Sequence, residues 1–148
     1  MSAWYNLRGG TMAFPGTFNI QYYKGDTYQF RIYPKDTAGN AFDLSDYKYD
    51  HDANPVTDKW DTATFAFAEV RGGNSATGYH KCLAQISDNG QYVTCTIRPA
   101  DADYLDPAKT YVYDVQVTKP GVDYNTVLTL LTGTITVTDQ VTSTSGLY

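Results

Sequence analysis

Apolar and polar residues alternate with a period of two along most of this chain, as in strands that turn one face to a core. No window of a dozen residues carries a helical stripe of apolar positions. Two strands are predicted first, over residues 17–23 and 27–33, and Lys24-Gly25-Asp26 is predicted to join them as a hairpin. Their inward residues are Phe18, Ile20, Tyr22, Tyr28, Phe30 and Ile32.

The alternation continues beyond this hairpin. Residues 43–49 predict a short third strand, and the Asp-rich segment 50–61 predicts a solvated loop. Residues 99–105 predict one helical turn, because Pro99 suits its start and the helix dipole stabilises carboxylates in a first turn. The remaining predicted strands are 62–71, 79–86, 91–98, 111–118 and 127–138, with hairpins at 87–90 and 119–125 and a bend or bulge near Gly133.

Seven or eight strands, with turns at intervals of about ten residues, are typical of an all-β, two-sheet antiparallel sandwich. At 148 residues the chain is long enough for one domain with a single core. We expect an N-terminal arm at 1–15, the sandwich domain at 16–142 and a C-terminal tail at 143–148. An arm of this kind can cross to a neighbouring subunit.

The spacing Leu105-x-Pro107-x-x-x-Tyr111 resembles the tyrosine corner of fibronectin type III sandwiches. In that arrangement a Tyr at the start of a strand bonds back to the backbone a few residues upstream. We therefore predict a structural role for these three residues.

Composition and charge narrow the classes of partner. The net charge is −5 and Lys and Arg are scattered singly, so we expect no nucleic-acid partner. The apolar runs are only a few residues long, which predicts neither a membrane span nor an export signal. Fourteen Tyr and a 15% share of aromatic residues indicate a globular chain rich in core and contact surface.

Cys82 and Cys95 lie on two predicted strands joined by a turn. They could approach each other if the register puts them on one face, and a slip of one residue would separate them. Because no export signal is predicted, we expect two reduced, partly buried thiols.

No catalytic, cofactor or metal site is predicted. His51 and His80 belong to no recognised motif, and His80 is expected beside a strand. Neither group of aspartates has the spacing of a calcium loop. The first group is Asp43, Asp46, Asp50 and Asp52, and the second is Asp101, Asp103 and Asp106. For the second group, a role in starting the helical turn is the simpler explanation.

Four aromatic residues are the predicted partner contacts. Tyr23 and Tyr33 point outward on the assumed pleat, and Trp4 and Tyr5 lie in the expected arm. Tyr and Trp supply large rigid contact area at interfaces.

Three phrases together resemble a set of small virion proteins of tailed phages, including cyanophages. They are residues 23–28 (YKGDTY), residues 42–47 (FDLSDY), and residues 111–117 (YVYDVQV) followed by 130–138 (LLTGTITVT). Their order, over about residues 16–142, is similar to the N-terminal domain of siphophage upper baseplate proteins. The resemblance implies an immunoglobulin-like or baseplate-type sandwich that packs into a phage particle and performs no chemistry.

Two departures from that pattern shape the expected role. Residues 50–61 stand where a strand would follow, and no coiled-coil extension for trimerisation follows the last strand. We therefore expect a capsid decoration or cement protein of the virion, assembled in the host cytoplasm. Its expected partners are the major capsid protein and further copies of this chain on a lattice.

Two alternatives remain open. The first is a tail, neck or baseplate component, with the tail or baseplate proteins as partners. The second is a module that binds host-surface carbohydrate through a region such as residues 72–79.

Overall fold

The computed structural model describes the backbone of residues 2–8 and all atoms of residues 15–47, 63–72, 78–119 and 121–139. These residues form an all-β fold, which confirms the predicted class. The described residues include no helix long and apolar enough to cross a membrane. The strands are β1 (Ser2–Arg8), β2 (Gly16–Thr17), β3 (Ile20–Tyr23), β4 (Tyr28–Lys35), β5 (Ala63–Ala68), β6 (Tyr79–Ile86), β7 (Val93–Ile97), β8 (Thr110–Lys119) and β9 (Thr126–Thr138).

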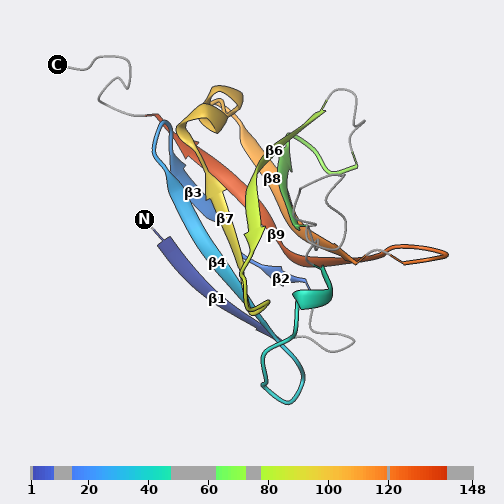
Figure 1. The fold of residues 1–148 in the computed structure, drawn as a ribbon. Coiled ribbons are helices and arrows are strands. Elements are labelled where there is room, and N and C mark those ends of the chain that lie inside the picture. Colours follow the sequence, from blue (N-terminus) through green and yellow to red (C-terminus); the bar gives the residue numbers. More distant parts are fainter. Residues whose placement is uncertain (1, 9–14, 48–62, 73–77, 120, 140–148) are drawn as a thin grey trace.

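Eight of these strands follow one hydrogen-bonded path, β1-β4-β7-β6-β5-β8-β9-β2, and the ninth, β3, pairs with β9 beside that path. Strand β6 joins the two halves of the path: residues 79–82 pair with β5, and residues 83–86 pair with β7. In Figure 1 the half that holds β4 and β7 lies in front of the half that holds β8 and β9. The sheet therefore curls so that its two halves enclose a common core.

Aromatic rings fill the space between the halves. The Phe30 ring of β4 lies 5.5 Å from the Phe65 ring of β5 and 6.4 Å from the Tyr113 ring of β8, centroid to centroid. All three side chains are almost fully buried. The residues predicted to point inward on β3 and β4 are buried as expected: Ile20, Tyr22, Tyr28, Phe30 and Ile32.

The predicted hairpin at residues 17–33 is wrong. Strand β3 pairs in parallel with β9, whereas β4 pairs with β7 and β1. The Tyr22 hydroxyl accepts a bond from the Gly25 N–H and donates to the Asp26 carbonyl oxygen, 2.7 Å away. This contact braces a turn that carries the chain from one half of the sheet to the other.

The expectation of purely antiparallel pairing also differs from the structure, because β1, β2 and β3 all pair in parallel at the ends of the path. Strand β1 lies within the segment expected to be an arm without alternation. It pairs with β4 over residues 2–8, since the backbone groups along that edge of β4 offer it hydrogen-bond partners.

The predicted strand at residues 43–49 is also wrong, within the part of that segment that the structure describes. A 3₁₀ helix, η1 (Ser45–Tyr47), stands there instead. The Asp43 carboxylate accepts the Ser45 N–H at 2.8 Å, a local bond that competes with strand pairing.

The bend or bulge predicted near Gly133 is a register shift at Leu130, three residues before it in β9. The register between β8 and β9 shifts between Val115 and Gln116, opposite residues 129–131. At Gly133 a Cβ would overlap the carbonyl oxygen of Phe18. This glycine therefore allows the β2–β3 connection to lie close alongside β9.

The two other predicted hairpins and the predicted helical turn are confirmed. The hairpins β6–β7 and β8–β9 form, and the helical turn is the 3₁₀ helix η2 (Pro99–Tyr104). Cys95 pairs with Ala84, which places Cys82 on the same face one pair further along. Both cysteines are buried and free.

Candidate functional site

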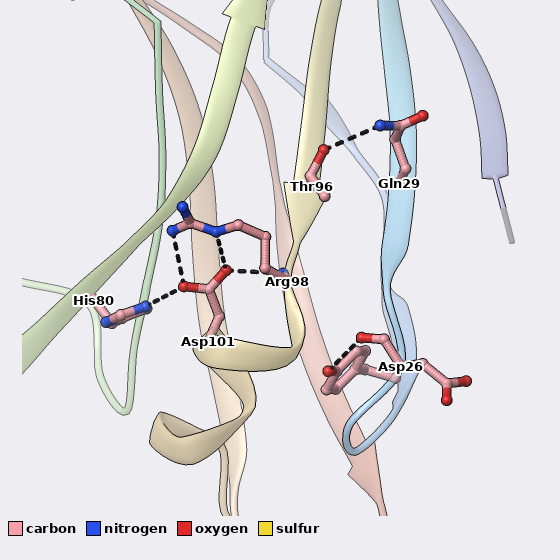
Figure 2. Close-up of polar contacts among 7 residues, drawn as sticks. Asp26, Gln29, His80, Thr96, Arg98 and Asp101 are labelled. Atoms are coloured by element: carbon pink, nitrogen blue, oxygen red, sulfur yellow. Dashed lines mark hydrogen bonds and ion pairs between the residues drawn. The ribbon is translucent and has the colours of Figure 1, made fainter. Parts of the chain in front are cut away.

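A polar cluster lies at one end of the core, where η2 meets β6 (Figure 2). His80 Nε2 is 2.6 Å from Oδ1 of Asp101, and the Arg98 guanidinium donates to both oxygens of the same carboxylate at 3.0 and 3.1 Å. The Asp101 side chain is only 1% exposed. This buried carboxylate is the centre of the cluster.

Local sequence positions that carboxylate. Arg98 is the N-cap of η2, Pro99 begins the helix, and Asp101 is its third residue. The Asp101 carboxylate reaches back to accept the Arg98 backbone N–H at 2.8 Å, as in a capping box. The predicted role of Asp101 at the helix start is therefore confirmed.

Aromatic rings surround the imidazole of the cluster. The Tyr104 ring stacks on the His80 ring with centroids 4.0 Å apart and planes 19° apart. The Phe67 ring lies 5.3 Å away on β5. Tyr104 is 60% exposed, so the stack reaches the surface.

The electrostatics of the cluster keep its carboxylate ionised. Burial acts to raise the pKa of Asp101, but hydrogen bonds from Arg98 and His80 outweigh it, so the pKa lies below its ordinary value. Burial, and then the nearby Asp101 charge, raise the pKa of the Cys82 thiol above its usual range.

His80, Cys82 and Asp101 place three donor atoms within 4.8 Å of one another, and zinc binds these residue types. Two features oppose a cation there. Both Asp101 oxygens already accept from the Arg98 guanidinium, itself a cation. The raised pKa of Cys82 disfavours the thiolate that a metal requires. We therefore interpret the cluster as an ion-pair network that fastens η2 to β6.

A groove of about 360 Å³ lies on the outer face of β5, β6 and β8, opposite the core. Ala66, Ala68 and Val112 contribute apolar surface to it. Arg71 and Lys81 are its cations among the described lining residues. The groove thus combines an apolar surface with a charged margin.

The charges of this groove are partly paired. Asp114 Oδ2 lies 3.8 Å from Arg71 Nη1, and Arg71 Nη2 donates to the Tyr113 carbonyl oxygen at 3.0 Å. Burial raises the pKa of Asp114, and Arg71 offsets only part of that rise. Within the described residues, Lys81 takes part in no ion pair.

The tip of the β8–β9 hairpin extends away from the curled sheet (Figure 1). Its apolar residues are open to solvent: the exposed fractions are 102% for Val122, 76% for Tyr124 and 52% for Val127. A Cβ on Gly121 would overlap the Tyr124 carbonyl oxygen, which shows how tightly the chain turns there. The tip is therefore a preformed apolar projection.

The tyrosine-corner residues occupy the predicted geometry. The Tyr111 hydroxyl accepts the Asp106 N–H at 2.8 Å, five residues upstream. Leu105 is buried beside it and Pro107 is half-buried.

Tyr23 and Tyr33, the two predicted contact residues whose side chains the structure describes, lie on strands that belong to different halves of the sheet. Tyr23 is 55% exposed on β3, as expected for an outward position. The Tyr33 ring instead packs 5.1 Å from the Tyr92 ring, over which the Arg31 guanidinium lies at 4.3 Å. Trp4 and Tyr5 belong to β1, whose side chains lie outside the described residues, as does His51.

Sequence reasoning missed the His80–Asp101 contact and the hairpin tip. The spacing Arg98-Pro99-x-Asp101 signals the capping box, but nothing local identifies His80 as its partner. The signal for the tip is Val-Asp-Tyr, two apolar residues inside a turn bounded by Gly121 and Asn125. No protein-family model matches this chain, and no curated protein matches it.

Proposed function

We propose that this chain is a structural protein of a tailed-phage virion, and that its role there is capsid decoration. It acts by packing its surface against other virion proteins and against copies of itself, and it catalyses no reaction. The observation that carries the proposal is the projecting β8–β9 hairpin, where Val122 is fully exposed and Tyr124 is largely exposed. Exposed aromatic and aliphatic side chains of this kind mark contact surfaces.

The phrases that resemble phage virion proteins belong to the framework of the fold. Residues 23–28 include the turn between β3 and β4, and residues 42–47 include η1. Residues 111–117 and 130–138 lie in β8 and β9. A resemblance carried by framework residues supports a shared architecture, and it supports a packing role more than a shared reactive site.

The chemistry of the polar cluster supports the same role. Asp101 is saturated by Arg98, His80 and a backbone N–H, which leaves it little freedom as a general base. Cys82 has a raised pKa, whereas a nucleophilic cysteine needs a lowered one. These groups are suited to holding η2 in place.

We propose further that the curled sheet is an immunoglobulin-like two-layer sandwich. One layer would hold β1, β4, β7 and residues 83–86, and the other β2, β3, β5, β8, β9 and residues 79–82. The contacts of Phe30 with Phe65 and Tyr113 across the core support this arrangement, as does the tyrosine-corner bond of Tyr111.

Gold labelling of intact particles tests the proposed function. Antibody against the purified chain is applied to virions of the phage that encodes it, and the gold is located by electron microscopy. Antibody absorbed with the purified chain beforehand is the control. Many gold particles over the head support decoration, and gold at one tail pole supports the tail, neck or baseplate alternative. Virions without gold above the control would overturn both.

The groove supports a second candidate, a carbohydrate-binding module. Tyr79 lines it with a half-exposed ring, and Asp114 and Lys81 offer hydrogen-bond partners for hydroxyl groups. Titration of host-envelope glycans against the chain tests this candidate. Binding that is lost in Tyr79→Ala and kept in Tyr104→Ala, an equally exposed tyrosine outside the groove lining, would favour it. Absence of binding would exclude it for the glycans used.

A further inference from the structure

Covering the tip of the β8–β9 hairpin would remove exposed apolar surface from water. Val122 is fully exposed and Tyr124 is 76% exposed, on a tight turn that is already formed. Burial of apolar surface is favourable by about 25 cal/mol per Å², and a preformed turn loses little conformational freedom on binding. The tip therefore has the properties of an anchor for a hollow surface.

The groove on β5, β6 and β8 has the size and lining to receive such an anchor. Its volume of about 360 Å³ lies at the lower end of pockets that hold small ligands. Ala66, Ala68 and Val112 supply small apolar contacts, which leave room for a ring.

The charges of the two surfaces are complementary. Asp123 stands between Val122 and Tyr124 at the tip, and Lys81 and Arg71 line the groove. Arg71 already lies near Asp114, which leaves Lys81 as the cation available to an incoming carboxylate. Asp123 likewise forms no ion pair with another described residue.

We propose that the hairpin tip of one copy docks into the groove of a second copy, with Tyr124 over the small apolar residues and Asp123 facing Lys81. The tip extends away from the body of its own chain, so the groove it meets belongs to a neighbour (Figure 1). Because tip and groove are different surfaces, the contact is head-to-tail and can repeat into a ring or an array. This inference rests on the proposed function and specifies one lattice contact of the assembled protein.

Complementation between two variants tests the head-to-tail contact. The tip variant is Val122→Ser with Tyr124→Ser, and the groove variant is Ala66→Arg. Sedimentation velocity over a concentration series should show self-association of the unchanged chain. Each variant alone should associate about thirtyfold more weakly or not at all. An equimolar mixture should give a 1:1 dimer and nothing larger, since only one intact tip and one intact groove can meet.

Charge exchange provides a second test that does not depend on how the groove variant folds. Lys81→Glu should weaken association about two- to fivefold, and adding Asp123→Lys to the same chain should restore it. Tyr104→Ser, which removes an exposed tyrosine away from both surfaces, is the matched control and should associate like the unchanged chain. Circular dichroism confirms that each variant is folded.

Three results would overturn the inference. They are an unchanged chain that stays monomeric at millimolar concentration, variants that associate like the unchanged chain, and folded variants whose mixture does not dimerise. Glycan binding abolished by Ala66→Arg, without self-association, would assign the groove to carbohydrate instead. Gold on the virion together with a monomeric chain would leave the proposed function standing while removing this contact.

Discussion

The substitution Phe30→Ala tests whether the two halves of the sheet close over one core. Phe30 is fully buried on β4. Its ring contacts those of Phe65 and Tyr113 from the other half, and it also lies 5.8 Å from the Phe18 ring.

The expected loss follows from this environment. Replacing a buried Phe by Ala costs about 3–5 kcal/mol, through lost transfer free energy and the cavity left behind. Edge-to-face ring pairs contribute about 0.5–1.5 kcal/mol each beyond the area they bury, which places Phe30→Ala in the upper part of that range. Phe30→Leu keeps most of the volume and should cost about 1.5 kcal/mol. The control Val122→Ala removes a fully exposed side chain and should change stability by about 0.5 kcal/mol or less.

Urea unfolding followed by circular dichroism measures these values, with the free energy of unfolding extrapolated to water and the m-values compared. A double-mutant cycle of Phe30→Ala with Phe65→Ala then isolates the contact between the halves, and a coupling of about 1 kcal/mol is expected. A loss below about 1.5 kcal/mol for Phe30→Ala, or a coupling near zero, would refute the reasoning that the curled sheet closes over this ring.

Three further predictions concern single contacts. Asp101→Asn should lower the free energy of unfolding by about 2 kcal/mol near neutral pH because it removes charged hydrogen bonds with Arg98. Since the folded pKa of Asp101 is lowered, this difference in stability should be complete above about pH 4 and should shrink as the pH falls below that value. Urea titrations at several pH values measure it, and a difference that grows in acid would contradict the prediction. Gly133→Ala should lower the free energy of unfolding by about 1–3 kcal/mol because its Cβ meets the Phe18 backbone, whereas Gly78→Ala, with open space around it, should have little effect; equal effects in thermal melts would count against this close approach. Tyr111→Phe should cost about 1 kcal/mol through loss of the corner bond, measured by the urea midpoint, and an unchanged midpoint would contradict that role.

The period-two pattern predicted which residues face the core but not which strands are neighbours. Tyr22 and Phe30 are both buried, as their alternation indicated, yet they lie on strands that pair with different partners. Alternation shows that one face of a strand is buried, and a strand can bury that face whichever strand it pairs with. The β6–β7 and β8–β9 hairpins were predicted from alternation on both sides of a single turn, but the same pattern at residues 17–33 predicted a hairpin that does not form, so the pattern does not by itself identify paired strands.

The candidate site was predictable only where it is local. The position of Asp101 follows from Pro99 and a carboxylate at the third helical residue, which sequence spacing reveals. Its contact with His80 spans 21 residues and depends on how η2 packs against β6. The groove depends on tertiary structure in the same way, because its lining comes from three strands that only the sheet brings together.

The high tyrosine content of the chain suggested a broad contact surface, but the hydroxyl bonds assign several tyrosines to the framework. Tyr22, Tyr111 and Tyr113 each bond through the hydroxyl to the backbone of a connection, and all three are buried. Such residues brace loops against strands, and their rings are not available to a partner. Tyr124 differs because its ring stands free on a turn whose shape is set by the backbone. An exposed tyrosine ring on a connection therefore indicates a contact surface for a partner more directly than the total number of tyrosines in the chain does.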